Sequence, residues 1–167
     1  DKFLNWAKTV PYTMRNPLYH WTHLELARYF DIYDLLNEKS AEKIWDITQE
    51  RLNSDGYSCR GLLKKANAEL VCTTEDPIDN LQYHQQLAKS DFSVKVSTAF
   101  RPDKAILISN DGYNEYIDTL GNVADVAINS FADLCDALRK RIVFFNENGC
   151  KLCDHGLDQI YFENYTE

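Results

Sequence analysis

Phe92-Ser-Val-Lys-Val-Ser-Thr-Ala-Phe100, followed at once by Arg101-Pro-Asp-Lys104, is the stretch that decides the fold. A short apolar run ends, on its C-terminal side, in a cluster of charged and polar residues. The same pattern occurs twice more, at residues 68–72 before 73–76 and at residues 150–153 before 154–155. Parallel α/β sheets carry their chemistry at the carboxyl ends of the strands. The repetition therefore predicts an active-site face formed by three strand ends.

Composition limits the partners that the chain can have. Its 167 residues are 44% hydrophobic, which is enough for a domain with a real core. The net charge is -8 and no block of Lys and Arg interrupts the acidity, which argues against a nucleic-acid or anionic-membrane partner. No apolar run approaches the roughly 20 residues of a membrane span.

The cysteines and the first residue suggest the setting of the chain. Its 5 cysteines have no disulfide-framework spacing, and most lie in apolar stretches, so we expect buried free thiols in a reducing cytoplasm. The chain starts at Asp1 and its single methionine is Met14, so we expect a piece of a longer polypeptide, or a processed one.

The chain contains two regions that differ in their expected secondary structure. Residues 1–67 read as helical, with helices expected at 18–30, 41–52 and 59–66, opened by Asn16, Ser40 and Ser58. From residue 68 onward, strands alternate with helices. The expected strands are 69–73, 93–99 and 151–154, and the expected helices are 78–88, 113–120 and 128–146. Residues 105–109 could be a further strand, which periodicity leaves open.

Strand–helix–strand alternation implies parallel pairing through right-handed crossovers. A (β/α)8 barrel needs eight such units, so about three strands cannot close one, and their outer edges stay unpaired. The sequence therefore predicts an α/β fold in which residues 68–167 form a partial TIM-type barrel with three parallel strands and crossover helices. Residues 1–67 would be a helical insertion before it, the whole being one structural unit cut from a longer enzyme.

His155 is the sharpest candidate for chemistry. A histidine at a strand end can ligate a metal or transfer protons near neutral pH, and a nearby carboxylate, such as Asp154 or Asp158, can fix its tautomer. The alternative is a histidine that is simply hydrogen-bonded in a loop.

Arg101 and Asp76 follow the other two expected strands. Arginine presents a rigid fork that suits a carboxylate, and Pro102 stiffens the turn that aims it. The alternative for Arg101 is a surface ion pair with Asp103. Asp76 either joins a polar site or caps a helix with Pro77 in the first turn, and we favour the cap.

Two other groups carry less weight. His20 and His23 lie three residues apart on one expected helix, whereas a helical metal pair normally uses a spacing of four. Of the two, His23 together with Glu25 is the better candidate for contacting a sugar. Cys150 and Cys153 resemble half of a zinc or redox site, but on a strand their side chains point to opposite faces.

Four of these clusters, taken together and in this order, resemble the uronate isomerase (glucuronate isomerase) family. The motifs span nearly the whole chain: Asn16-Pro-Leu-Tyr-His-Trp-Thr-His-Leu-Glu-Leu26, Thr73-Thr-Glu-Asp-Pro-Ile-Asp79, Phe100-Arg-Pro-Asp-Lys-Ala105 and Asp154-His-Gly-Leu-Asp158.

The resemblance implies a bacterial, cytoplasmic enzyme with an amidohydrolase-type metal-dependent (β/α)8 barrel. Such an enzyme interconverts the hexuronates D-glucuronate with D-fructuronate and D-galacturonate with D-tagaturonate, and it can form homo-oligomers. By resemblance, Arg101 binds the uronate carboxylate, His155 is the active-site histidine, and His23 and Asp76 are additional substrate-binding residues.

Family members bind a divalent metal, often zinc, through a His-x-His pair on the first strand and an Asp on the last. This chain contains no His-x-His, so we expect it to hold no metal alone. His155 is its one candidate for a metal contact.

Two other interpretations stay open at this point. One is a related amidohydrolase-type metal-dependent hydrolase acting on an amide or ester, which shares the barrel and the strand-end histidine. The other is a non-catalytic assembly module whose exposed sheet edges pair with a partner.

Overall fold

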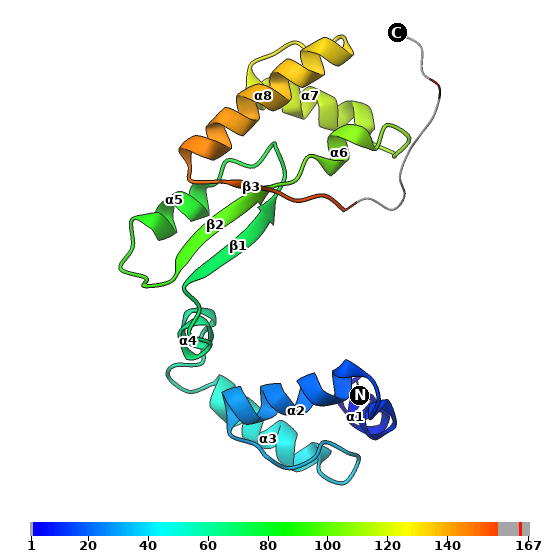
Figure 1. The fold of residues 1–167 in the computed structure, drawn as a ribbon, viewed down its shortest axis with the longest axis vertical. Helices are drawn as coiled ribbons and strands as arrows, with labels where there is room; N and C mark the ends of the chain where they lie inside the picture. The colour runs from blue at the N-terminus through cyan, green and yellow to red at the C-terminus, as the bar shows by residue number, and fades with distance from the viewer. Residues whose placement is uncertain (1, 157–163, 165–167) are drawn as a thin grey trace. The chain divides into compact units, whose positions relative to one another are not determined.

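The computed structural model describes residues 2–156 and 164 (Figure 1). It divides the chain into two compact units, Asp1–Ala68 and Glu69–Glu167. The first unit is helical, and the second contains the sheet.

Helices make up the regular structure of the first unit, and five of them are described: α1 (Lys2–Thr9), the 3-10 helix η1 (Val10–Thr13), α2 (Pro17–Phe30), α3 (Ala41–Leu52) and α4 (Cys59–Lys65). Its core is a cluster of small and aliphatic side chains: Ala7, Val10, Leu26, Ile32, Leu36, Ala41 and Ile44. Helices α1, η1, α2 and α3 thus each bury apolar residues in this core, whereas α4 has no buried residue.

Two of the three predicted helix caps are confirmed. The Asn16 side chain accepts the Leu18 N–H at 2.9 Å, and the Ser58 hydroxyl accepts the Gly61 N–H at 3.2 Å. The cap predicted at Ser40 is wrong, because its side chain makes no cap hydrogen bond. The Ser40 hydroxyl instead donates to the Leu35 carbonyl at 2.8 Å and closes the loop before α3.

The second unit is built around a parallel three-stranded sheet in the order β1-β2-β3 (Figure 1). Its elements are β1 (Leu70–Glu75), α5 (Gln82–Ala88), β2 (Lys95–Phe100), α6 (Asp103–Ile106), α7 (Tyr113–Ala124), α8 (Phe131–Glu147) and β3 (Leu152–Cys153). Each strand is followed or preceded by helices, as in a TIM-type barrel, so the predicted fold class is confirmed.

The helices expected at 113–120 and 128–146 are observed as Tyr113–Ala124 and Phe131–Glu147, and two further differences concern residues 105–109 and 78–81. Residues 105–109 do not form a strand, because α6 covers Asp103–Ile106. The helix expected from residue 78 begins only at Gln82, after a turn in which Asp79 Oδ1 accepts the Leu81 N–H at 2.6 Å. Leu81 then adopts a left-handed backbone, with φ of 55°, which a helix cannot continue.

The two faces of the sheet are unlike. Phe100 packs with Leu81, Phe145 and Cys150, so this face carries the core shared with α8. Successive strand residues point to opposite faces, and in β1 the second set is exposed: Leu70, Cys72 and Thr74. This second face is thus exposed along β1, whereas Ala99 of β2, which pairs with Thr74, is buried.

The thiols are less buried than predicted. Only Cys150 is buried, Cys135 is intermediate, and the other three are exposed: Cys59, Cys72 and Cys153. Cys72 is exposed because it lies on the uncovered face of β1. Within the described part of the chain, no helix is long and apolar enough to cross a membrane.

Candidate active site

The ends of the three strands carry the candidate site, and the backbone sets its residues in place. The Arg101 N–H donates to the Glu75 carbonyl at 3.0 Å, and the Asp154 N–H donates to the Phe100 carbonyl at 3.2 Å. The sheet hydrogen bonding thus continues one residue beyond β2 and β3. Arg101 and Asp154 therefore lie at the same carboxyl edge of the sheet.

Arg101 is paired with Asp154. One terminal nitrogen of its guanidinium donates to Asp154 Oδ2, and the Thr74 hydroxyl donates to the same oxygen at 3.2 Å. The guanidinium and this hydroxyl hold the pKa of the Asp154 carboxyl below its ordinary value. Arg101 thus forms an ion pair, as the alternative interpretation predicted, but its main partner is Asp154 and not Asp103.

Asp103 joins Arg101 to His155. Its carboxylate accepts the Gly156 N–H at 2.7 Å, lies 3.2 Å from His155 Nδ1, and comes within 3.8 Å of Arg101 Nε. The Asp103 side chain is only 15% exposed, whereas those of Arg101 and His155 are 39% and 46% exposed. The two leading predicted residues, Arg101 and His155, are therefore brought together at one carboxylate.

This contact also fixes the tautomer of His155. An ionised carboxylate can only accept, so Nδ1 of the ring carries the proton that faces Asp103. The lone pair of the neutral ring is then on Nε2. Asp158, the other carboxylate considered from the sequence, lies outside the described residues.

Arg101 has a buried donor without a hydrogen-bond acceptor among the described residues. Its Nε is buried and has no hydrogen-bond partner within the described part of the chain, although the side chain as a whole is 39% exposed. A buried donor without an acceptor costs free energy unless a ligand or water satisfies it. The terminal nitrogens of the guanidinium carry further N–H donors besides the one bonded to Asp154, so Arg101 has the capacity to bind an additional acceptor, such as a carboxylate oxygen.

Asp76 forms a second cluster at the end of β1. Its carboxylate accepts the Tyr116 hydroxyl at 2.9 Å and the Ile78 N–H at 3.2 Å, and it lies 3.3 Å from Lys104 Nζ. Burial and the Asp76 charge raise the pKa of Tyr116. The favoured prediction for Asp76 is wrong, because it closes a turn and does not cap a helix. A role in substrate binding stays a prediction.

His23 belongs to the first unit, and both of its ring nitrogens are engaged there. Nδ1 donates to the Tyr19 carbonyl at 2.7 Å, and Nε2 accepts the Leu36 N–H at 2.9 Å. These bonds tie α2 to the loop before α3. The other three predicted residues lie in the second unit, and a contact of His23 with substrate stays a prediction.

Sequence reasoning did not select Asp103, Lys104 or Tyr116 as site residues. Asp103 was considered only as an ion-pair partner of Arg101, although its place two residues after a strand-end arginine was a usable signal. Tyr116 gave no signal, because an aromatic residue inside a helix is normally part of the core.

The described residues do not supply a metal shell. No group of three or more His, Cys, Asp and Glu side chains among them could hold a metal ion. Asp103 and His155 are two potential ligands that lie side by side, but their facing atoms are already bonded to each other.

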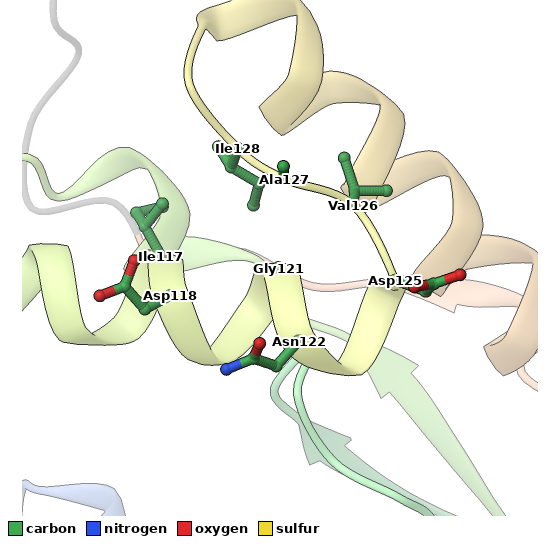
Figure 2. Close-up of a pocket in the computed structure, with 8 residues that line it drawn as sticks. All are labelled: Ile117, Asp118, Gly121, Asn122, Asp125, Val126, Ala127 and Ile128. Atoms are coloured by element: carbon green, nitrogen blue, oxygen red, sulfur yellow. The ribbon is translucent and has the colours of Figure 1, made fainter.

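An open pocket of about 550 Å³ lies elsewhere, between α7 and the loop before α8 (Figure 2). It is lined by side chains such as Ile117, Asp118 and Ile128 and contains none of the predicted site residues. At its floor a Cβ on Gly121 would meet the Val126 carbonyl oxygen at 2.8 Å, so glycine allows the loop to pass this close.

Parallel strands with crossover helices and a charged cluster at their carboxyl ends define part of a TIM-type β/α barrel. The glucuronate isomerase family model matches residues 1–167, and the chain belongs to that family.

Curated relatives agree with this assignment. The uronate isomerase of Flavobacterium johnsoniae is 76% identical over 167 residues, which are 100% of this chain and 36% of the relative. That of Bacillus pumilus is 52% identical over 167 residues, which are 100% of this chain and 35% of the relative. The chain thus spans about a third of the length of these relatives.

Solved structures share the fold. A uronate isomerase from Thermotoga maritima matches with a TM-score of 0.85 at 32% identity, covering 92% of this chain and 34% of the other. A glucuronate isomerase from Caulobacter crescentus also has a TM-score of 0.85, at 24% identity, covering 92% and 32%; this likeness concerns the fold alone.

Proposed function

We propose that this chain supplies the carboxylate-binding and proton-transfer edge of a uronate isomerase. The reaction interconverts D-glucuronate with D-fructuronate, and D-galacturonate with D-tagaturonate. One observation supports it most: in a chain that matches the family from end to end, Arg101 and His155 meet at Asp103 beyond parallel strands.

Arg101 binds the uronate carboxylate in this proposal. Its guanidinium is a fixed cation at the strand edge, and its buried Nε has no protein acceptor among the described residues. A carboxylate can accept two parallel N–H bonds from such a fork. Fixing the acidic end of the sugar in this way also fixes the place of the reacting carbons, C1 and C2, at the other end.

His155 transfers a proton in this proposal. Aldose–ketose isomerisation moves a proton between C1 and C2, which needs a group whose pKa lies near the working pH. Histidine meets that need, and its contact with Asp103 presents Nε2 as the acceptor. Asp76 and His23 are secondary candidates for contacts with the sugar hydroxyls.

The divalent metal that the family resemblance implies, zinc by preference, is assigned to the whole enzyme. The described residues do not form its ligand set. The chain has no His-x-His pair, and we propose that the metal ligands lie in other parts of the enzyme. A cytoplasmic location and a homo-oligomeric state belong to the same proposal.

A chimera tests the proposal. This chain replaces the corresponding third of the Flavobacterium johnsoniae enzyme, to which it is 76% identical, and turnover of glucuronate and galacturonate is measured. We expect activity within about tenfold of the intact relative, since core substitutions that conserve volume cost little. A folded chimera without turnover would contradict the proposal, and hydrolysis of amide or ester substrates would favour the hydrolase interpretation.

Arg101→Lys in the chimera separates carboxylate binding from the rest. Losing one bond of a charge-assisted pair costs about 1.5–3 kcal/mol, or about 10- to 150-fold in KM. Arg139→Lys is the matched control, because Arg139 is exposed on α8, where it forms a surface ion pair with Asp136. An unchanged KM in the Arg101 variant would remove that residue from the proposal.

A further inference from the structure

Arg141 is a buried cation that the proposed reaction does not use. It lies on α8 and is only 7% exposed. Its Nε donates to the Pro77 carbonyl at 2.6 Å, and a terminal nitrogen donates to the Asp79 carbonyl at 2.7 Å. The guanidinium also lies 4.1 Å from the centre of the Phe144 ring.

The burial of this charge is unfavourable by itself. It lowers the pKa of the Arg141 guanidinium, and the Asp79 charge offsets that only in part. Asp79 Oδ1 is engaged with the Leu81 N–H, so the guanidinium is held chiefly by backbone carbonyls. An apolar residue would fill the space without this penalty, which indicates that the forked donor itself is needed here.

The carbonyls that Arg141 binds belong to the loop between β1 and α5, residues 76–81. This loop has no regular ladder; its one turn bond joins the Asp79 N–H to the Asp76 carbonyl at 2.9 Å. Leu81 ends it in a left-handed conformation and is 1% exposed. Such a backbone persists only when its surroundings hold it, and α8 does so with Phe145 under Leu81 and with Arg141.

The loop is connected directly to the strand-end cluster. Asp76, its first residue, holds Tyr116 of α7 and Lys104 of α6 through its carboxylate. Lys104 follows Asp103, the residue where Arg101 and His155 meet. A shift of the Pro77 and Asp79 carbonyls would therefore reach Asp76 first and α6 next.

We propose that Arg141 is a positioning residue of the active site. It fixes the 76–81 loop, so that Asp76 can hold Lys104, and with it the start of α6, in the place that aligns Arg101. The kinetic consequence rests on the proposed function, whereas the effect on the loop does not.

Hydrogen exchange tests the loop without reference to activity. In the full-length chimera, Arg141→Lys keeps the charge but loses the fork. We expect exchange at the amides of Ile78, Asp79 and Leu81 to accelerate at least tenfold, while strand amides in β1 and β2 keep their rates. Arg139→Lys, on the same helix with a side chain 72% exposed, should change the exchange rates of neither the loop amides nor the strand amides.

Kinetics then test the link to the site. We expect Arg141→Lys to raise KM for glucuronate about tenfold with a smaller change in kcat. In a background of Asp76→Asn, Arg141→Lys should raise KM little further, because both substitutions disturb the same chain of contacts from the loop to α6.

The outcomes separate the alternatives. Equal acceleration at all amides, or additive effects of the two substitutions, would assign Arg141 to general stability and overturn the proposal. Arg141→Gln avoids burying an ammonium; failure of both variants to fold beside a normal Arg139→Lys would overturn it as well. An inactive unsubstituted chimera would contradict the proposed function, while the exchange result would still decide the role of Arg141 in the loop.

Discussion

Asp103→Asn is the substitution that tests the candidate site most directly. The carboxylate serves two donors, the Gly156 N–H at 2.7 Å and His155 Nδ1 at 3.2 Å. An amide has one oxygen, and the shorter bond to Gly156 should keep it. The amide nitrogen would then face His155, and the ring would have to accept at Nδ1 and carry its proton on Nε2.

The expected fall in kcat follows from the loss of the hydrogen bond between His155 Nδ1 and the Asp103 carboxylate. One hydrogen bond to a charged group is worth about 1.5–3 kcal/mol, which corresponds to about 10- to 150-fold. We expect kcat of the chimera on glucuronate to fall by that factor, because the nitrogen that should accept a proton no longer can. KM should change less, since Arg101 keeps its bond with Asp154.

Steady-state kinetics on folded protein, checked by circular dichroism, provide the measurement. Asp136→Asn is the control, because Asp136 is exposed on α8 and far along the chain from the strand ends. If Asp103→Asn folded normally and kept its kcat, the link from Asp103 to His155 would have no part in catalysis.

Three further predictions concern the chain alone. The 167-residue chain with added zinc should not isomerise hexuronates, and robust turnover would contradict the assignment of the metal ligands to other parts of the enzyme. It should self-associate with rising concentration, since Leu152 is 55% exposed in β3, whose outer edge pairs with no described strand. Leu152→Lys should reduce this association in sedimentation, and a clean monomer would count against it. The Ser130 hydroxyl and the Asn129 N–H lower the pKa of the Asp133 carboxyl. The ionised Asp133 should therefore stabilise α8 at a pH above its unfolded-state pKa, and this stabilisation should be lost as the pH falls through its folded-state pKa. Ser130→Ala should raise the Asp133 pKa in a carbon-13 NMR titration, and an unchanged pKa would refute the cap.

The strands could be predicted because their pattern is local. The expected strand 93–99 is observed as Lys95–Phe100 and ends directly before the polar cluster. The expected strand 69–73 is observed as Leu70–Glu75 and continues into its polar cluster. The turn at 76–81 could not be predicted. Asp76 and Pro77 have the sequence of a helix start. Arg141, 64 residues away along the chain, binds the Pro77 carbonyl while this segment forms a turn and not a helix. Local preference yields to such a tertiary contact.

The site was predictable only in part, for a similar reason. Arg101 and His155 are marked by strand ends, and both reach the edge that the parallel topology implies. The partners that fix their geometry come from distant segments, and Tyr116 in particular has no signal in the sequence. His23 shows the converse case, because a conspicuous histidine is engaged by two backbone groups.

The polar contacts of the site also complete the sheet. β3 is only two residues long, and its pairing with β2 covers Ala99 and Phe100. So short a ladder fixes the segment that follows it only weakly. The bonds from Arg101 to Asp154 and from Asp103 to Gly156 therefore hold residues 154–156 against the end of β2. In this part of the chain, the same polar contacts that orient the candidate chemistry attach its third strand, so loss of the Gly156–Asp103 bond should loosen β3, and loss of the His155–Asp103 contact should displace His155.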